Sequence, residues 1–311
     1  MICTVTLNPA YDKTVTVKDL ITHEVNVILD VRFDPGGKGI NVSRVVKELG
    51  SQTKALGIIG GDTGLFLKNF LEGRGIVTDF VHVDQPTRTN LTIIDIDNPP
   101  DTKLNEPGPV IEESVLLKVE KTILDALNES KFFVFAGSLP VGCPDNTYCR
   151  MIDLVRQRGA IAIVDTRDGA LRESIKSLPY MIKPNACEAS ALLGREVITP
   201  EEACVAAKEF YKMGIKIAVI SLGGDGAVMA CDDGVFLGTP PKVKVESTVG
   251  SGDSLVAGIC TGIESGLPLP DAFRLGLAAG TATATTPGTS LCKKDTVELI
   301  IGRVQVKKIS E

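Results

Sequence analysis

The sequence predicts an α/β protein in which helices cover both faces of a mainly parallel central sheet. Between residues 2 and 221, short apolar segments alternate with longer segments of helical periodicity. This alternation is typical of right-handed crossovers between parallel strands. The apolar segments are rich in Val and Ile, as strands buried on both faces require. After residue 221 the alternation stops and glycine-rich turns follow, which indicates antiparallel strands at one edge of the sheet.

The elements follow in order along the 311 residues, which we interpret as a single domain. Strands are expected at 2–8, 54–59, 79–83, 132–136, 160–165, 180–183 and 216–221. Helices are expected at 40–49, 64–73, 112–128, 145–158, 168–176, 186–193 and 200–213. The turns at 223–226 and 232–234 predict hairpins. Helices are expected again from Ser254 to about Glu264 and from Asp271 to Thr286, and the chain is expected to end in helical structure.

Two segments, 13–33 and 89–105, interrupt this order. Residues 13–17 and 25–31 alternate as two short strands, and 89–105 does the same around a turn at 98–101. No helix separates the strands within either pair, so we place all four in a small second sheet. An exposed face of alternating Val, Ile and Leu needs cover, and pairing with a second copy would provide it. We therefore expect a homodimer.

Composition excludes several classes of function. The net charge of −6 disfavours a nucleic-acid partner, which requires a basic surface. No apolar stretch approaches the roughly 18 residues of a membrane span, and residues 2–7 predict a strand rather than a signal peptide. None of the eight cysteines forms a Cys-x-x-Cys pair, and there are two histidines, so zinc and histidine chemistry are disfavoured. We expect a cytoplasmic protein with reduced cysteines.

The most informative motif is Thr-Val-Gly-Ser-Gly-Asp at 248–253, directly before a predicted helix. Two glycines let successive amides point at one place, and the helix adds the positive end of its dipole, which favours an anion. A carboxylate there would repel a bound phosphate. Asp253 makes sense if it aligns a neutral hydroxyl against a phosphoryl group held by the amides. The alternative is an ordinary acidic residue in the first turn of a helix.

A second motif, Pro-Gly-Gly-Lys-Gly-Ile-Asn-Val-Ser-Arg, occupies 35–44 and also precedes a helix. Lys38 is expected in the loop, where its ammonium can contact a substrate phosphate, and Asn41 on the first helical turn faces the same place. The alternative is a flexible surface turn with a solvated lysine. The Walker phosphate loop does not fit, because no Ser or Thr follows the Gly-Lys pair.

Together these motifs resemble the ribokinase-like (PfkB) carbohydrate kinases, in the subgroup of 1-phosphofructokinases and tagatose-6-phosphate kinases. The resemblance covers nearly the whole chain and includes further matches at 6–12, 137–140, 183–185 with Glu188, and 221–223 with Gly226. It implies a three-layer ribokinase-like fold in which the small second sheet is a β lid over the sugar. It also implies an ATP-dependent kinase that uses Mg2+, and it leaves open whether the turn at 287–289 lies near adenine or near a monovalent cation.

The resemblance implies roles for the residues of these motifs, and it agrees with the rule that ligands of open α/β sheets bind beyond the carboxyl ends of the strands. Asp253 would be the catalytic base, with the amides of Gly250, Ser251 and Gly252. The sugar phosphate would be bound by Asp12, Gly37, Lys38, Asn41, Arg88 and Ser138. ATP would be bound by Lys183, Asn185, Ser221, Gly223, Gly226 and Thr248. Glu188 would hold Mg2+ through water. The spacing of Asn185 and Glu188 is equally that of an ordinary helix N-cap with an acid at its third position.

Fructose 1-phosphate is the preferred substrate, phosphorylated at its 6-hydroxyl, and tagatose 6-phosphate is the alternative. Fructose 6-phosphate is disfavoured because Val25 and Val27 stand where the minor 6-phosphofructokinases have basic residues. Ser251 stands where alanine is commoner in the family. Two other classes of protein are disfavoured by the sequence. A dinucleotide-dependent oxidoreductase lacks its Gly-x-Gly-x-x-Gly turn after the first strand. A non-catalytic sugar-phosphate-binding protein would not need the intact Asp253.

Overall fold

The computed structural model describes residues 1–98 and 101–309. Its main sheet has ten strands in the order β14-β13-β12-β11-β10-β9-β8-β1-β4-β5. The strands from β11 to β5 in this order are parallel to their neighbours, as the alternating sequence predicted. Their bounds are β1 (Ile2–Thr6), β4 (Thr53–Gly60), β5 (Val77–Val83), β8 (Phe132–Ala136), β9 (Ile161–Asp165), β10 (Met181–Ile182) and β11 (Ile217–Ser221).

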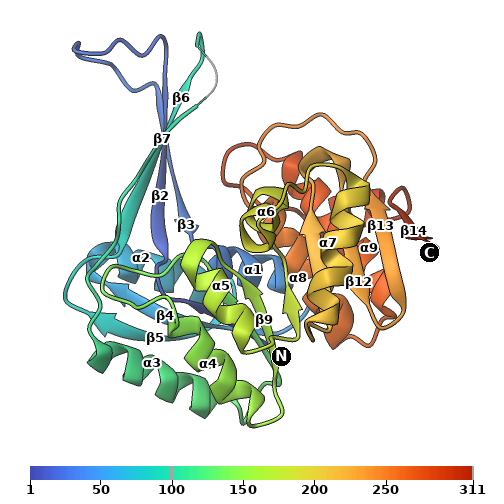
Figure 1. The fold of residues 1–311 in the computed structure, drawn as a ribbon. Coiled ribbons are helices and arrows are strands. Elements are labelled where there is room, and N and C mark those ends of the chain that lie inside the picture. The colour runs from blue at the N-terminus through green and yellow to red at the C-terminus, as the bar shows by residue number, and fades with distance from the viewer. Residues whose placement is uncertain (99–100, 310–311) are drawn as a thin grey trace.

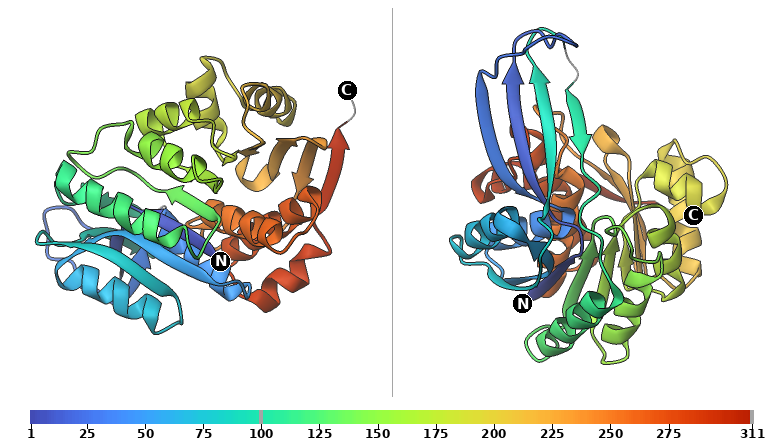
Figure 2. Two further views of the ribbon diagram at one scale, coloured as in Figure 1. Left: turned by 90° about the horizontal axis from the view of Figure 1, so that it is seen from below. Right: turned by 90° about the vertical axis from the view of Figure 1, so that its left-hand side faces the viewer.

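Helices cover both faces of this sheet, which confirms the three-layer prediction (Figures 1 and 2). One face carries α3 (Glu113–Ala126), α4 (Thr147–Arg156), α5 (Asp168–Lys176), α6 (Ala186–Leu193) and α7 (Pro200–Lys212). The other face carries α1 (Lys38–Glu48), α8 (Ser251–Glu264), α9 (Leu269–Ala284) and α10 (Lys294–Ile301). The remaining helix, α2 (Gly61–Glu72), packs in a smaller cluster with Ile59 and Phe80.

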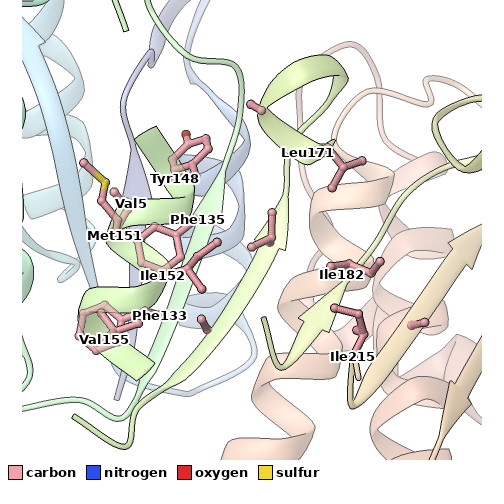
Figure 3. Close-up of a cluster of buried hydrophobic side chains, with 14 of the residues drawn as sticks. Val5, Phe133, Phe135, Tyr148, Met151, Ile152, Val155, Leu171, Ile182 and Ile215 are labelled. Carbon is pink, nitrogen blue, oxygen red and sulfur yellow. The ribbon is translucent and has the colours of Figure 1, made fainter. Parts of the chain in front are cut away.

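The larger core lies between the sheet and the first set of helices. Figure 3 shows Phe133 and Phe135 of β8 facing Met151, Ile152 and Val155 of α4. Each of these side chains is fully buried. The strands are therefore apolar on both faces because each face has its own layer of helices to pack against.

The antiparallel edge consists of β12 (Ala227–Cys231), β13 (Gly234–Thr239) and β14 (Gln305–Ile309). A short 3-10 helix, η1 (Gly223–Asp225), makes the first turn, so the two predicted hairpins are confirmed. The expectation that the chain ends in helical structure is wrong, because β14 follows α10 and pairs with β13. This strand contains Lys307 and Lys308, and lysines of this kind protect an exposed sheet edge from pairing with another chain.

A separate four-stranded sheet, in the order β3-β2-β6-β7, rises from the main body (Figure 2, right). Its strands are β2 (Ala10–Val17), β3 (Asp30–Gly36), β6 (Arg88–Asp95) and β7 (Thr102–Asn105). We call this sheet the lid. The predicted turn at 98–101 falls partly outside the described residues, since residues 99 and 100 are not described.

The predicted strand at 25–31 is wrong in its bounds, because β3 begins at Asp30 and residues 25–29 form a loop. The cause is the side chain of Asn26, which accepts a hydrogen bond from the Ile21 amide at 2.9 Å and donates to Ile21 O at 2.8 Å. Such local bonds replace the pairing that a strand would need. Asp12 lies within β2, after the turn that follows β1.

The register of the lid sorts its residues into two unlike faces. Residues paired across strands point the same way, so Phe33 shares a face with Lys13, Leu91 and Leu104. Val31, Val15 and Ile93 form the next row on that apolar face. The opposite face carries polar groups, with Asp34 paired to Asp12 and Asp12 to Asn90. Among the described residues, no helix is both long enough and apolar enough to cross a membrane.

Candidate active site

The candidate site residues collect at the carboxyl ends of neighbouring parallel strands. Ser138 follows β8, Asp165 ends β9, Lys183 follows β10 and Ser221 ends β11. The chain runs from β1 outward through β4 and β5 and then returns to β8 on the other side of β1, so the strand order reverses between β1 and β8. Ligands of open α/β sheets bind at such a point, beyond the carboxyl ends of the strands.

Asp253 lies in the first turn of α8, which begins at Ser251 and so starts three residues earlier than predicted. Gly250 is the N-cap with φ of 77°, a left-handed conformation that suits glycine. The Ser251 amide donates to Thr248 O at 3.3 Å, but the amides of Gly252 and Asp253 have no partner within the helix because they belong to its first turn. The positive end of α8 is therefore open to an anion.

The Asp253 carboxyl is buried and accepts a hydrogen bond from Nδ2 of Asn41 at 2.8 Å through Oδ2. Burial raises the pKa of Asp253 above its ordinary value, although the positive charge of Lys38 opposes the rise. A carboxylate with a raised pKa is a better proton acceptor than an exposed one. The structure thus brings together Asp253 and Asn41, which lie 212 positions apart in the sequence.

Lys38 is the first residue of α1 rather than part of the loop, and Gly37 before it has φ of 111°. Its Nζ lies 2.8 Å from Oδ1 of Asp165, and Nζ of Lys183 lies 3.5 Å from the same oxygen. Burial alone would raise the pKa of Asp165, but the charges of Lys183 and Lys38 outweigh it and hold that pKa below its usual range. Burial alone would lower the pKa of Lys38, but the charge of Asp165 outweighs it and raises that pKa.

Sequence reasoning missed Asp165. A signal was present, because this carboxylate ends a predicted apolar strand and is followed by Thr166 and Arg167. Its Oδ1 accepts both lysines, whereas its Oδ2 is buried and has no hydrogen-bond partner in the part of the chain that the structure describes. An orphaned carboxylate oxygen of this kind is a suitable acceptor for a hydrated cation.

The predicted sugar-binding residues Asp12 and Arg88 lie at the base of the lid. Asp12 accepts a hydrogen bond from Nδ2 of Asn90 at 2.8 Å, and burial raises its pKa to about 6. Arg88 donates to three backbone carbonyls, those of Asn8, Pro9 and Glu106. Its guanidinium therefore joins the lid to the segment after β1 and has two further N–H groups for a ligand.

Ser138, the last of the predicted sugar-binding residues, accepts a hydrogen bond from Nδ2 of Asn8 at 3.5 Å. Its loop follows β8, and Gly137 before it has φ of 101°. A side chain at Gly137 would come within 4.0 Å of Lys38, so this loop and the start of α1 lie against each other.

Beside the first turns of α8, a cavity of about 500 Å³ is lined by four of the predicted ATP-binding residues, namely Ser221, Gly223, Gly226 and Thr248. Ser251 and Gly252 also line it, so the cavity reaches the amide-rich end of α8. Its remaining wall is largely apolar and includes Val243, Val245, Leu255 and Leu277. An apolar slot that ends at an anion site is suited to a planar base with a phosphate chain.

Lys183 and Asn185 do not line this cavity among the described residues, although Lys183 lies against Gly252. Asn185 lines a neighbouring cavity of about 240 Å³ that shares Ser221 and Gly223 with the larger one. Asn185 and Glu188 form a capping box, in which Asn185 Oδ1 accepts from the Glu188 amide at 2.8 Å and Glu188 Oε2 accepts from the Asn185 amide at 2.9 Å. The N-cap alternative is therefore present in the structure.

A capping box does not prevent a role beside magnesium. It occupies Oε2 of Glu188, and Mg2+ in proteins keeps several waters and needs few protein ligands. In the part of the chain that the structure describes, no group of three or more His, Cys, Asp or Glu residues could hold a metal by itself. The residues present thus fit an ion bound mainly by phosphate and water.

The turn at 287–289, considered for adenine or a monovalent cation, contacts the lid. The Thr289 hydroxyl donates to Oδ2 of Asp34 at 2.6 Å, and Arg32 donates to Thr289 at 3.0 Å and to Pro287 O at 3.3 Å. Arg32 and Asp34 are themselves paired at 2.8 Å. Strand β3 of the lid is therefore attached to the segment between α9 and α10.

The chain is similar to known proteins over nearly its whole length. A family model described as pfkB family carbohydrate kinase matches residues 5–296. The 1-phosphofructokinase of Bacillus subtilis is 36% identical over 310 residues, which cover 99% of this chain and 100% of that protein. The 1-phosphofructokinase of Borreliella burgdorferi is 34% identical over 99% of each chain.

Among solved structures, phosphofructokinase-2 from Escherichia coli in complex with potassium superimposes with a TM-score of 0.92 at 31% identity, covering 97% of this chain and 98% of that one. The same protein in its tetrameric inhibited form has a TM-score of 0.90 at 30% identity over the same shares.

Proposed function

Because the chain belongs to the pfkB family of carbohydrate kinases and is a sugar-phosphate kinase, we propose that its substrate is fructose 1-phosphate. The products would be fructose 1,6-bisphosphate and ADP. The enzyme is a phosphotransferase that acts on a hydroxyl group, and kinases of this family use ATP with a divalent cation. The observation that carries the choice of substrate is the similarity to two 1-phosphofructokinases over 99% of the chain. The kinase chemistry is supported by the buried Asp253, which accepts a hydrogen bond from Asn41 at the open amide end of α8.

In the proposed reaction, Asp253 accepts the proton of the sugar 6-hydroxyl as the oxygen forms its bond to the γ-phosphorus. The bond from the γ-phosphorus to the bridging oxygen breaks, and ADP leaves with that oxygen. The amides of Gly252 and Asp253 donate to the transferred phosphoryl group, whose developing charge they stabilise. The proton on Asp253 then passes to solvent.

Lys38, Arg88 and Asp12 would bind the sugar phosphate. Lys38 supplies a cation next to Asp253, and Arg88 supplies N–H groups at the base of the lid. Asp12 would accept bonds from sugar hydroxyls, together with Ser138. The negative charge of the substrate phosphate would compensate the positive charges of Lys38 and Arg88.

We propose that the divalent ion is Mg2+ and that Glu188 holds it through water, with Asp165 as a further acceptor. The ion would neutralise charge on the phosphate chain. A monovalent cation is the second proposed cofactor, on the ground that the phosphofructokinase-2 structure contains potassium. We expect the protein to lie in the cytoplasm, where ATP and phosphorylated sugars are both present.

We also propose that the protein forms a homodimer through its lids. The apolar lid face exposes Phe33 at 42%, Val31 at 43% and Leu104 at 56% of their surfaces. A second lid would cover these side chains. Phosphofructokinase-2 has a tetrameric form, so the number of subunits is itself to be measured.

The substrate proposal is tested by ADP release with four sugars: fructose 1-phosphate, tagatose 6-phosphate, fructose 6-phosphate and ribose. We expect the highest kcat/KM with fructose 1-phosphate. A higher value with tagatose 6-phosphate would leave the kinase mechanism intact and change the substrate, whereas no ADP release with any sugar would contradict the proposal as a whole.

A further inference from the structure

Arg44 is a cationic side chain beside the active site that the reaction above does not use. It lies on α1 one turn after Asn41, so the two side chains share a face of the helix. Nη1 of Arg44 donates to the Asn41 side-chain oxygen at 3.2 Å and to Pro35 O at 3.1 Å. The guanidinium carbon lies 5.5 Å from the centre of the Phe70 ring, a cation–π contact.

The chemistry of these groups fixes which way the Asn41 amide points. A guanidinium can only donate hydrogen bonds, so the atom of Asn41 that faces Arg44 must be its oxygen. The amide nitrogen then faces the opposite way, toward Asp253, and its Nδ2 lies 2.8 Å from Oδ2 of that carboxylate. If the side-chain amide of Asn41 were rotated by 180°, its N–H groups would face the N–H groups of Arg44, and its oxygen would face the carboxylate oxygen of Asp253.

We propose that Arg44 is a positioning residue for phosphoryl transfer, which holds the Asn41 amide so that its N–H group aims and stabilises the Asp253 carboxylate. The inference rests on the proposed role of Asp253 as the base. The chain of contacts runs from Pro35 at the end of lid strand β3, through Arg44 and Asn41, to Asp253 at the start of α8.

The surrounding charges define what a pH profile would report. Asp253 faces Lys38, Lys183 and Asp165 besides Asn41. Arg44 faces Asp34 and Asp12 as well as Arg74 and Arg32, and burial lowers its pKa to about 10, so it stays charged at neutral pH. Removing Arg44 leaves the other neighbours of Asp253 in place. The free amide then donates less to Asp253, and loss of a donor to the charged form raises the pKa of that carboxyl.

The test compares Arg44→Met, Arg44→Lys, Asn41→Ala and the double variant Arg44→Met with Asn41→Ala, using the ketose phosphate that the wild type accepts best. We expect Arg44→Met to lower kcat by about 10- to 100-fold, because misplacement of a catalytic group costs that much, with an unchanged KM for ATP. The acidic limb of the kcat profile should move to higher pH. Arg44→Lys should recover part of kcat, since it keeps the charge but not the planar fork.

The double variant separates positioning from a merely structural role. If Arg44 acts through Asn41, its loss on the Asn41→Ala background should change kcat by less than about twofold, because the two effects are coupled. Arg74→Met is the matched control: its guanidinium carbon lies 3.5 Å from the centre of the same Phe70 ring, but it donates to Phe70 O rather than to Asn41. This control should keep the wild-type kcat and pH profile.

A wild-type kcat and acidic limb in folded Arg44→Met would overturn the inference, as would an undiminished loss on the Asn41→Ala background. If Arg44→Met does not fold, Arg44→Lys decides: a displaced acidic limb supports the inference and a wild-type limb with wild-type kcat overturns it. Failure of the proposed substrate is seen separately, in the wild type, as turnover of another ketose phosphate in place of fructose 1-phosphate.

Discussion

Nζ of Lys38 lies 2.8 Å from Oδ1 of Asp165, at the carboxyl end of β9, and so ties the first helix of the chain to the middle of the sheet. Lys183 approaches the same oxygen from β10 at 3.5 Å. One buried carboxylate thereby sets the place of two lysines that we assign to different substrates, Lys38 to the sugar phosphate and Lys183 to ATP. The negative charge of Asp165 therefore compensates one lysine in the sugar half of the site and one in the ATP half, and its loss would leave both lysines without this partner.

Replacement of Asp165 by Asn should therefore destabilise the protein. The two lysines would lose their buried counter-charge, and breaking a buried ion pair costs about 3–5 kcal/mol in the free energy of unfolding. Urea titration of Asp165→Asn would measure this. The matched control is Asp125→Asn, which removes an exposed pair with Lys121 at 2.7 Å and should cost less than about 1 kcal/mol.

The same contact predicts a pH dependence. The pKa of Asp165 is lowered in the folded state, so its ion pairs add stability above the unfolded pKa of about 3.9, and this stability is lost as the pH falls through the folded pKa. Wild type should lose more stability than Asp165→Asn on acidification below about pH 4. Equal losses in both proteins would show that the lysines do not depend on Asp165.

Asp253→Asn should lower kcat by roughly 100- to 10,000-fold, because the amide has no basic oxygen to accept the sugar proton. ATP binding should be nearly unchanged, since the side chain of Asp253 does not line the cavity that we assign to ATP and the variant keeps its backbone amide. Isothermal titration with a nonhydrolysable nucleotide and steady-state kinetics would measure the two properties. Retention of most of kcat would remove Asp253 from the role of base.

The raised pKa of Asp253 also gives a direction for the pH profile of the wild type. The carboxylate must be ionised to accept a proton, so kcat should fall as the pH drops through this raised pKa. The acidic limb should therefore lie above the ordinary range of an aspartate. A limb at the value of an exposed aspartate would contradict the burial argument.

Lys38→Met should raise KM for the sugar phosphate by about 10- to 100-fold, as expected for a lost charge-assisted hydrogen bond, with a smaller effect on kcat. The substrate phosphate is present throughout the reaction, so binding is lost equally in the ground and transition states. Steady-state kinetics with varied sugar phosphate would measure it. An unchanged KM would leave Lys38 with the structural role alone, as the partner of Asp165.

The sequence predicted most of the main sheet because its strands are apolar and its helices are periodic, and these are local properties. It also indicated the two glycine-rich motifs as candidate site segments, because their Gly, Asp and Lys residues lie close together along the chain. It missed Asp165 and Arg44, because the roles of these residues depend on partners brought close only by folding. Lys38 and Asp165, for example, lie 127 positions apart.

The lid shows a second limit to what the sequence alone can predict. Alternation predicted its strands but not their bounds, because the side chain of Asn26 forms a local turn where Val25 and Val27 suggested a strand. The pairing of β2 with both β3 and β6 then fixed which side chains share a face. Periodicity within one strand cannot supply that register.

The lid register leads to the last prediction, that the protein is a dimer and that charge on the apolar lid face dissociates it. Val31→Asp combined with Leu104→Asp places two carboxylates on that face, where burial against a second lid would be costly. Sedimentation at micromolar concentration should give a dimer for wild type and a monomer for this variant. Leu299→Asp, at a position on α10 that is 77% exposed, is the control and should remain a dimer.

Hydrogen exchange in β3 and β6 should slow in wild type when sugar phosphate and a nonhydrolysable nucleotide bind, because a closed lid excludes water from the γ-phosphate. A monomeric wild type with the same exchange rates in both states would contradict the lid model, since neither pairing nor closure would then protect the strands.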